Sequence, residues 1–403
     1  MYSILFVDDE PAITQALKRM LRPMRREWDM HFVQSGKDAL GYMEDNPVDL
    51  IISDMRMPEM NGAELLGEVI KRYPSVIRII LSGQSDQEII LKTIKPAHQF
   101  LTKPCDAVTL RQAIKQTLAL KSNLENPALQ NLVSKIESLP SLPRSYHEIM
   151  QIVQKEEGSL KEVAEIIQND VSMSMEILKY VNSSFFGLYK EVTSIRQAVS
   201  LLGINTIQTL VLSINVFSQF DKSKHYAINI HELWEHSFFT GLFSKAIIAD
   251  LGMDRNLQED AFTLGLLHDI GILILATQIP EKYKEVYEEA KRSNLVLSEV
   301  EYQIFDTSHA EVAAYLIGLW GISSNLITVI STHHLTRPMP DESNVFSIAM
   351  QSADIFSQNL MQKNQGLRPE EFPTALLNNK TFISHRERWE QICMEIYGRK
   401  SDE

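Results

Sequence analysis

Short, largely apolar runs alternate with amphipathic stretches through the first 120 residues. The runs predict buried strands over Ile4–Val7, Met30–Gln34, Leu50–Asp54, Arg78–Leu81 and Gln99–Leu101. Apolar positions three and four residues apart predict helices over Ile13–Leu21, Lys37–Met43, Ala63–Lys71, Asp86–Ile94 and Ala107–Leu120. Strands that alternate with helices favour an α/β domain, with a parallel sheet covered on both faces.

Polar side chains stand where the predicted strands end. In an open parallel sheet these ends share one edge, which would carry Asp8, Asp9, Asp54, Ser82 and Lys103. Three carboxylates at one edge repel each other unless a cation joins them, and oxygen ligands suit Mg²⁺. The ion would neutralise an incoming phosphoryl group while Asp54 attacks it. Lys103 would supply a fixed positive charge to that group, and Ser82 a hydrogen bond.

Residues 1–120 resemble the receiver domain of two-component response regulators, a (βα)5 flavodoxin-like fold. The resemblance rests on Asp8-Asp9, Asp54, Met57-Pro58, Gly62, Ser82 and Lys103-Pro104. It implies that a sensor histidine kinase phosphorylates Asp54. It implies four Mg²⁺ ligands: Asp8, Asp9, Asp54 and the backbone carbonyl of Arg56. It also implies the switch residues Ser82, Phe100 and Lys103. The alternative is a flavodoxin-like domain that has a few acidic loop ends.

The sequence after residue 120 predicts helices without β alternation. Residues 121–138 begin polar and contain Pro127, which predicts a linker helix, either a break or a rigid continuation of the last receiver helix. An all-helical domain is expected over 139–403. Within it, we expect an N-terminal helical subdomain over 139–220 and a second helical subdomain over 225–403.

Residues 139–220 resemble the opening of the HDOD family, the HD-related output domains of bacterial signalling proteins. The segments that carry this resemblance are Leu139–Pro143, Ile166–Asp170, Val181–Gly187 and Ile195–Gly203. They consist of packing and turn residues and include no obvious catalyst. The family is regarded as an output and scaffold domain without an established common activity, so the resemblance implies output by protein contact.

Histidines and aspartates recur at helical positions in the last subdomain, where Leu264–Gly271 predicts a helix that runs into a glycine. The set is His236, His268, Asp269, His309, His333, His334 and Asp354. A helical bundle can bring such side chains to one interior point. Mixed imidazole and carboxylate ligands suit Fe, Mn, Ni or Zn better than Mg or Ca, and such ions would generate hydroxide and hold a phosphate for hydrolysis. The alternative is that these histidines cap helix ends or fill the core.

Part of this set, namely the first histidine, the His-Asp pair and the last aspartate, resembles the ligands of HD-superfamily metal phosphohydrolases. With the remaining histidines, the set is similar to the two-metal site of HD-GYP cyclic-di-GMP phosphodiesterases. Two departures matter: Ile272 stands where that family has a phosphate-binding lysine, and Leu335–Pro340 lacks the Gly-Tyr-Pro loop. Cyclic-di-GMP hydrolysis is not expected, because an apolar residue cannot replace a phosphate-binding cation.

Composition narrows the class of protein further. The chain has 403 residues, 44% hydrophobic and 23% charged, which fits a soluble globular protein of two or three domains. The formal net charge of -13 argues against a nucleic-acid-binding surface. Cys105 and Cys393 have no paired spacing and favour a reducing compartment. No basic leader is present, and apolar segments such as Ile270–Ala276 are too short to span a bilayer. We therefore expect a cytoplasmic protein without membrane insertion.

Two functional hypotheses follow. In the first, the chain is a response regulator that is phosphorylated on Asp54 and acts on a downstream protein by direct contact. In the second, the last subdomain is a phosphorylation-regulated metal phosphohydrolase. A third, weaker possibility is nucleotide sensing without hydrolysis. The sequence leaves open the kinase, the downstream partner, the metal, the substrate and whether the chain forms a homodimer.

Overall fold

The protein is described here from a computed structural model. It describes residues 1–398 except 74, 83–96, 98, 104, 124–126, 135–143, 154–158, 183–191, 219–225, 321–323, 335–340 and 362–370. The chain divides into two compact units. The first comprises residues 1–142 and 315–324, and the second residues 143–314 and 325–403. Each unit is considered by itself.

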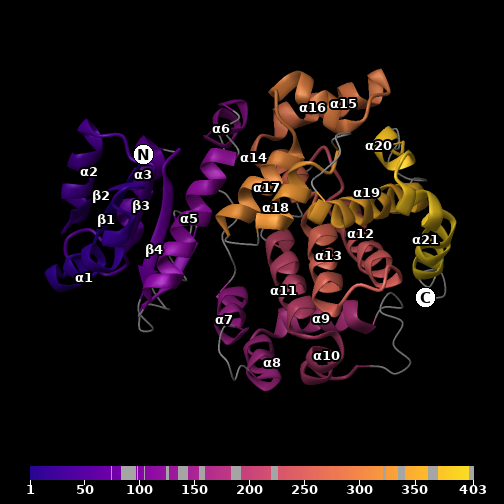
Figure 1. The fold of residues 1–403 in the computed structure, drawn as a ribbon, viewed down its shortest axis with the longest axis horizontal. Helices are drawn as coiled ribbons and strands as arrows, with labels where there is room; N and C mark the ends of the chain where they lie inside the picture. The colour runs from indigo at the N-terminus through magenta and orange to yellow at the C-terminus, as the bar shows by residue number, and fades with distance from the viewer. Residues whose placement is uncertain are drawn as a thin grey trace. The chain divides into compact units, whose positions relative to one another are not determined.

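The first unit contains a five-stranded parallel sheet in the order β2-β1-β3-β4-β5. The strands are β1 (Tyr2–Val7), β2 (Trp28–Val33), β3 (Leu50–Asp54), β4 (Ile77–Ser82) and β5 (Gln99–Thr102). Strand β3 lies between β1 and β4 and is buried along its whole length (Figure 1). The predicted α/β fold is therefore confirmed, with all five predicted strands present to within about two residues.

Helices cover both faces of this sheet. They are α1 (Pro11–Leu21), α2 (Gly36–Asp45), α3 (Gly62–Arg72) and α5 (Ala107–Asn123), with α6 (Pro127–Ser134) after them. Alternate residues of β1 enter separate cores: Phe6 packs in the core with Leu17 and Ile114, whereas Leu5 packs with Leu66 of α3. The predicted helix over Asp86–Ile94 lies outside the described residues.

The second unit is helical throughout its described residues, as predicted. Its elements are α7 (Arg144–Val153), α8 (Leu160–Gln168), α9 (Val171–Asn182), α10 (Ile195–Leu202), α11 (Ile204–Ser218), α12 (Ile230–Asp250), α13 (Arg255–Leu267), α14 (Ile270–Gln278), α15 (Pro280–Ser293), α16 (Leu297–Phe305), α17 (His309–Leu319), α18 (Ser324–Ser331), α19 (Asp341–Met361), α20 (Thr374–Leu377) and α21 (Lys380–Gly398). The end of α17 from Tyr315 and the first residue of α18, Ser324, belong to the first unit.

Helices α12, α13 and α19 form the centre of the second unit (Figure 1). The crossing of α12 and α13 is tight, because a Cβ added to Gly265 would lie 2.4 Å from the backbone nitrogen of Gly241. Any larger residue there would force these helices apart. The helical stretch Arg255–Gln278 has the length and hydropathy of a membrane span, contrary to the expectation that no segment would reach it, but 83% of its most apolar window is buried inside the protein.

One predicted element is wrong in a way that matters for the site. The sequence suggested a helix that runs through Leu264–His268 and stops at Gly271. Instead, α13 ends at Leu267, His268 and Asp269 form a turn, and α14 begins at Ile270. Two successive helices therefore flank the His-Asp pair. The pair stands at a break in the backbone, where the two side chains can face the same interior point.

Candidate functional sites

Asp54 ends β3 at the carboxyl edge of the sheet. Lys103 Nζ donates a hydrogen bond to Asp54 Oδ1 and another, of 2.8 Å, to Asp8 Oδ2. The backbone N–H of Arg56 donates to Asp54 Oδ2 at 2.8 Å. The following segment packs closely against Asp54, since a Cβ on Gly62 would stand 2.2 Å from the Asp54 carbonyl oxygen. Glycine at position 62 is thus required by the close approach of α3 to β3.

The charges of this pocket oppose one another. Burial raises the pKa of the Asp54 carboxyl, and the Lys103 ammonium works against that rise. Burial alone would lower the pKa of Lys103, but its hydrogen bonds to Asp54 and Asp8 leave it raised. Lys103 therefore keeps its proton at neutral pH. It bridges the carboxylates of Asp8 and Asp54.

For the other predicted receiver residues, the structure describes only part of the side chains. Asp9 is half-buried directly after Asp8 at the same edge. Ser82 ends β4 and Phe100 lies within β5, but both side chains are outside the described part of the structure. The backbone N–H of Arg56 contacts the Asp54 carboxylate, and the role of the Arg56 carbonyl as a Mg²⁺ ligand stays a prediction. The carboxylates of Asp8 and Asp54 offer the hard oxygen ligands that Mg²⁺ takes.

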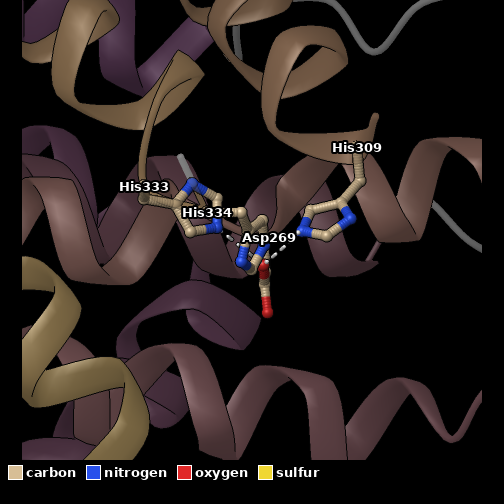
Figure 2. A group of neighbouring side chains, drawn as sticks. All are labelled: Asp269, His309, His333 and His334. Atoms are coloured by element: carbon tan, nitrogen blue, oxygen red, sulfur yellow. Dashed lines mark hydrogen bonds and ion pairs between the residues drawn. The ribbon is translucent and has the colours of Figure 1, made fainter. Parts of the chain in front are cut away.

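The seven histidines and aspartates predicted in the last subdomain come together in the second unit. They form two groups, in each of which the ligand atoms lie within 4.8 Å of one another. The first group is Asp269, His309, His333 and His334 (Figure 2). Oδ1 of Asp269 lies 3.3 Å from His309 Nε2 and 3.7 Å from His333 Nε2, and the Nε2 atoms of His309 and His334 are 2.7 Å apart.

The second group is His236, His268 and Asp354. Oδ1 of Asp354 lies 3.0 Å from His236 Nε2 and 3.7 Å from His268 Nε2. Oδ2 of Asp269 faces this group as well, 3.4 Å from His236 Nε2 and 3.2 Å from His268 Nε2. The two oxygens of Asp269 therefore point to different groups, so this one carboxylate joins them.

Each of the four most buried histidines is held by its other ring nitrogen. Nδ1 of His268 lies 2.7 Å from the carbonyl oxygen of Gly265, and Nδ1 of His333 lies 2.7 Å from that of Ile330. Nδ1 of His236 lies 3.1 Å from Ser357 Oγ, and Nδ1 of His309 lies 2.6 Å from Glu301 Oε2. Carbonyls and carboxylates only accept, which assigns the proton of His268, His333 and His309 to Nδ1 and leaves Nε2 facing the cluster.

The electrostatics match a site that is built for a cation. Burial alone would lower the pKa of His268, but the Asp269 and Asp354 carboxylates raise it to about 10. Burial lowers the pKa of His333 to about 4, helped by the neighbouring His334. Burial would raise the pKa of Asp269, yet His268 and the other histidines hold it well below its usual range. Asp269 as an anion and His333 as a neutral ring are thus in the form that binds a metal ion, whereas the ring of His268 carries an additional proton.

Two buried atoms in the first group support a metal ion directly. Asp269 Oδ1 and His333 Nε2 have no hydrogen-bond partner in the described structure. Buried polar atoms nearly always find a partner, so two buried atoms that lack a hydrogen bond and lie 3.7 Å apart fit a cation bound between them. Their imidazole and carboxylate chemistry fits Fe, Mn, Ni or Zn. The donor set therefore suits a metal pair. Two of its members, His268 and His333, also bond carbonyls in the last turns of α13 and α18 through Nδ1.

Sequence reasoning missed the residues that hold these ligands. Glu301, Tyr283 and Ser357 lie on helices with no motif spacing that would have singled them out. Glu301 precedes His309 by eight residues and belongs to a different helix. Only their contacts identify them. Of the two departures from the HD-GYP pattern, Ile272 is buried in α14, and Leu335–Pro340 lies outside the described residues.

Curated relatives cover parts of the chain. An uncharacterized protein of Treponema pallidum is 25% identical over 240 residues, which are 59% of this chain and 45% of that protein. The regulatory protein LuxO of Vibrio parahaemolyticus is 30% identical over 148 residues, 36% of this chain and 32% of LuxO. The transcriptional regulatory protein GlrR of Escherichia coli is 36% identical over 116 residues, 28% of this chain and 26% of GlrR. The chain spans less than half the length of each.

Solved structures match the helical part. An HDOD domain protein of unknown function from Geobacter sulfurreducens aligns with a TM-score of 0.54 and 18% identity, over 69% of this chain and 99% of that one. A putative phosphohydrolase from Shewanella amazonensis aligns with a TM-score of 0.53 and 23% identity, over 69% of this chain and 97% of that one. At these identities the likeness is one of fold.

Two family models complete the comparison. The response regulator receiver domain matches residues 4–115, and the HDOD domain matches residues 139–336. The first range contains Asp8, Asp54 and Lys103, and the second contains six of the seven metal-type side chains, all except Asp354. The chain therefore joins a response regulator receiver domain to an HDOD domain.

Proposed function

We propose that this protein is a response regulator in which a sensor histidine kinase phosphorylates Asp54 and the HDOD domain transmits the signal by contact with another protein. The observation that carries the proposal is the shared hydrogen bonding of Lys103 with Asp54 and Asp8 at the end of β3. A buried carboxylate beside a fixed cation and a second carboxylate suits phosphoryl transfer with Mg²⁺. We assign the receiver to residues 1–120, a connector to 121–138 and the output domain to 139–403.

The chemistry of the proposed step is limited to positioning and charge. Bound Mg²⁺ would supply positive charge to the transferred group, with Asp8, Asp9 and Asp54 as its carboxylate ligands. Asp54 Oδ attacks the phosphorus atom, and the bond to the donor oxygen or nitrogen breaks. Lys103 stays protonated throughout and stabilises the added negative charge. Formation of the aspartyl phosphate breaks the Lys103–Asp54 pair. The receiver therefore has two states that differ in the charge and contacts of Asp54.

Incubation with acetyl phosphate and Mg²⁺ tests this proposal. The wild-type protein should gain one phosphoryl group by intact mass, and the Asp54→Asn variant none. Asp49→Asn is the matched control, because Asp49 directly precedes the opposite end of β3 and accepts from Ser3 N–H at 2.7 Å. Phosphate uptake by the Asp54→Asn variant equal to that of the wild-type protein would reject Asp54 as the acceptor.

A second candidate function is favoured by one observation: Asp269 joins two groups of metal-type ligands. We propose that the HDOD domain holds two transition-metal ions, one per group. Such ions would supply Lewis acidity for the hydrolysis of a phosphate ester. The protein's own contribution is a buried, preorganised cage, since six of its seven ligands are fully buried. Ile272 argues against a cyclic dinucleotide as the substrate, because it offers no charge to a phosphate.

Metal analysis of the purified full chain tests the second candidate. Two equivalents of Fe, Mn, Ni or Zn are expected, and none should remain in a variant that combines Asp269→Asn with His268→Ala. Turnover of phosphomonoesters and nucleotides should then follow metal content. A protein that stays metal-free after exposure to each of these ions would leave only the protein-contact output.

A further inference from the structure

Glu301 is a buried carboxylate next to the metal cluster. Its Oε2 atom accepts from the backbone N–H of His309 at 2.8 Å and from Nδ1 of the same residue at 2.6 Å. Its Oε1 atom accepts from the Tyr283 hydroxyl at 2.6 Å. A carboxyl group that accepts from three donors has no hydrogen-bond role for a proton of its own. Glu301 is therefore an anion in the interior of the domain.

This arrangement is different from that of the other cluster histidines. His268 and His333 donate to backbone carbonyls, and His236 faces a serine hydroxyl. Those partners are neutral and fix only the orientation of the ring. Among these four histidines, only His309 has a carboxylate as the partner of its Nδ1 atom. A charged acceptor on Nδ1–H pushes electron density toward Nε2 and makes the imidazole a stronger ligand.

The distribution of carboxylates between the two groups explains why His309, and not another histidine, has Glu301 as its partner. The group of His236 and His268 has its own carboxylate, Asp354, and shares Asp269. Within the described part of the chain, the group of His309, His333 and His334 has only the shared carboxylate of Asp269. Two dications in equivalent positions would thus meet unequal negative charge. Glu301 restores the balance, since it adds a second carboxylate on the histidine-rich side.

We propose that Glu301 is the counter-charge of the histidine-rich group and that it sets, through His309, the affinity of the metal ion held there. Tyr283 of α15 holds Glu301 of α16 in place, and Glu301 holds His309 of α17. We call this chain of hydrogen bonds the relay. Glu301 is a positioning residue, because it touches a ligand and not the ion. The inference rests on the proposed metal pair and assigns a residue that controls one half of it.

The test is Mn²⁺ binding to the full chain, measured by equilibrium dialysis after removal of endogenous metal. Glu301→Gln keeps the size of the side chain and an acceptor for His309 but removes the charge. We expect one of two Mn²⁺ ions to bind about 10- to 100-fold more weakly, while the other keeps its affinity. Electron paramagnetic resonance should then change from a coupled pair to an isolated ion. Glu299→Gln, an exposed change on the same helix, is the matched control and should leave both ions in place.

A second variant separates charge from folding. Tyr283→Phe keeps the Glu301 charge and removes one hydrogen bond, so it should weaken the same ion by a smaller factor. Two outcomes would overturn the inference alone: two tightly bound ions in Glu301→Gln, or equal weakening of both ions. Unchanged affinity in Tyr283→Phe would overturn the relay if Glu301→Gln does not fold. A wild-type chain that binds no Mn²⁺ would instead overturn the metal pair and, with it, any role for Glu301.

Discussion

Gly271 approaches His309 so closely that a Cβ on residue 271 would stand 2.0 Å from the His309 carbonyl oxygen. The same Cβ would lie 3.0 Å from the backbone nitrogen of Ala313. Helix α14 therefore begins in direct backbone contact with the first turn of α17. This contact holds Asp269, two residues before Gly271, against the Nε2 atom of His309. The glycine that looked like a helix stop is thus a packing residue beside the histidine and aspartate cluster.

Gly271→Ala should move α17 away from α14 and separate His309 from Asp269. We expect a loss of about 1–3 kcal/mol in stability from overpacking, together with weaker metal binding. Gly41→Ala is the control, because Gly41 lies within α2 and nothing stands within 4 Å of its added Cβ. That change should stabilise the protein by about 0.5–1 kcal/mol, since alanine is the better helix former. Thermal unfolding and dialysis measure both, and unchanged metal affinity in Gly271→Ala would contradict the packing argument.

Asp269 and Asp354 should differ in the number of ions they control. Asp269→Asn removes the carboxylate that both groups share, so both ions should be lost. Asp354→Asn affects only the group with His236 and His268, so about one of the two ions should remain. Metal content after dialysis, counted per chain, separates the two results. Equal losses from the two variants would mean that the groups do not act as separate sites.

Lys103 should govern how Asp54 phosphorylation depends on pH. Burial raises the pKa of Asp54, and Lys103 counteracts this, so loss of Lys103 raises that pKa further. Only the ionised carboxylate attacks phosphorus, hence the pH profile of Lys103→Ala should shift to higher pH. Its rate at the optimum should also fall, on the order of 10²-fold, as for loss of a transition-state donor. Initial rates with acetyl phosphate across a pH series provide the measurement. Lys71→Ala, which removes an exposed partner of Glu68, should behave as wild type.

Metal binding should release protons. The Asp269 and Asp354 carboxylates outweigh burial and raise the pKa of His268 to about 10, so at pH 7–8 the metal-free protein holds a proton on this ring. A metal ion must displace it, because only the neutral ring ligates. Calorimetric titration with Zn²⁺ in buffers of different ionisation enthalpy should therefore show release of at least one proton per chain. Binding heats that do not depend on the buffer would contradict this assignment.

Metal removal should destabilise the HDOD domain and not the receiver. A ligand that binds only the folded state at 100 times its Kd adds about 2.7 kcal/mol per site. A strong chelator should thus lower the unfolding temperature of the helical domain and leave the receiver transition in place. Calorimetric scans, together with circular dichroism scans, can follow the two transitions. A fall in both transitions would indicate that the chelator acts on the receiver as well.

Much of the receiver could be predicted from the sequence, because its signals are local. A run such as Leu50–Ile52 is apolar on both faces, which fixes β3 as a central strand, and Asp54 then falls at the strand end by counting alone. The carboxyl ends of parallel strands share one edge, so Asp8 and Lys103 could be placed beside it before any coordinates. The position of a helix over Asp86–Ile94 remains a prediction.

The helical domain was less predictable, because the 3.6-residue pattern reports which face is buried and not what it faces. Gly271 followed an apolar helix and suggested a stop, whereas the tertiary fold uses it for contact with His309. Helix length alone cannot distinguish a glycine that ends a helix from one that allows two helices to pack closely. Residue type still marked His268 and Asp269 as ligands, because imidazole and carboxylate groups are seldom buried without a partner.

The sequence by itself determined the order of the two domains, the position of Asp54 at the end of its strand and the set of side chains able to hold a metal. Only the tertiary structure decided how that set divides, with the two oxygens of Asp269 turned to separate groups. It also decided that Glu301 stands behind His309. The physical reason is distance along the chain: hydrogen bonds between helices depend on how the helices pack, and no local pattern encodes that packing.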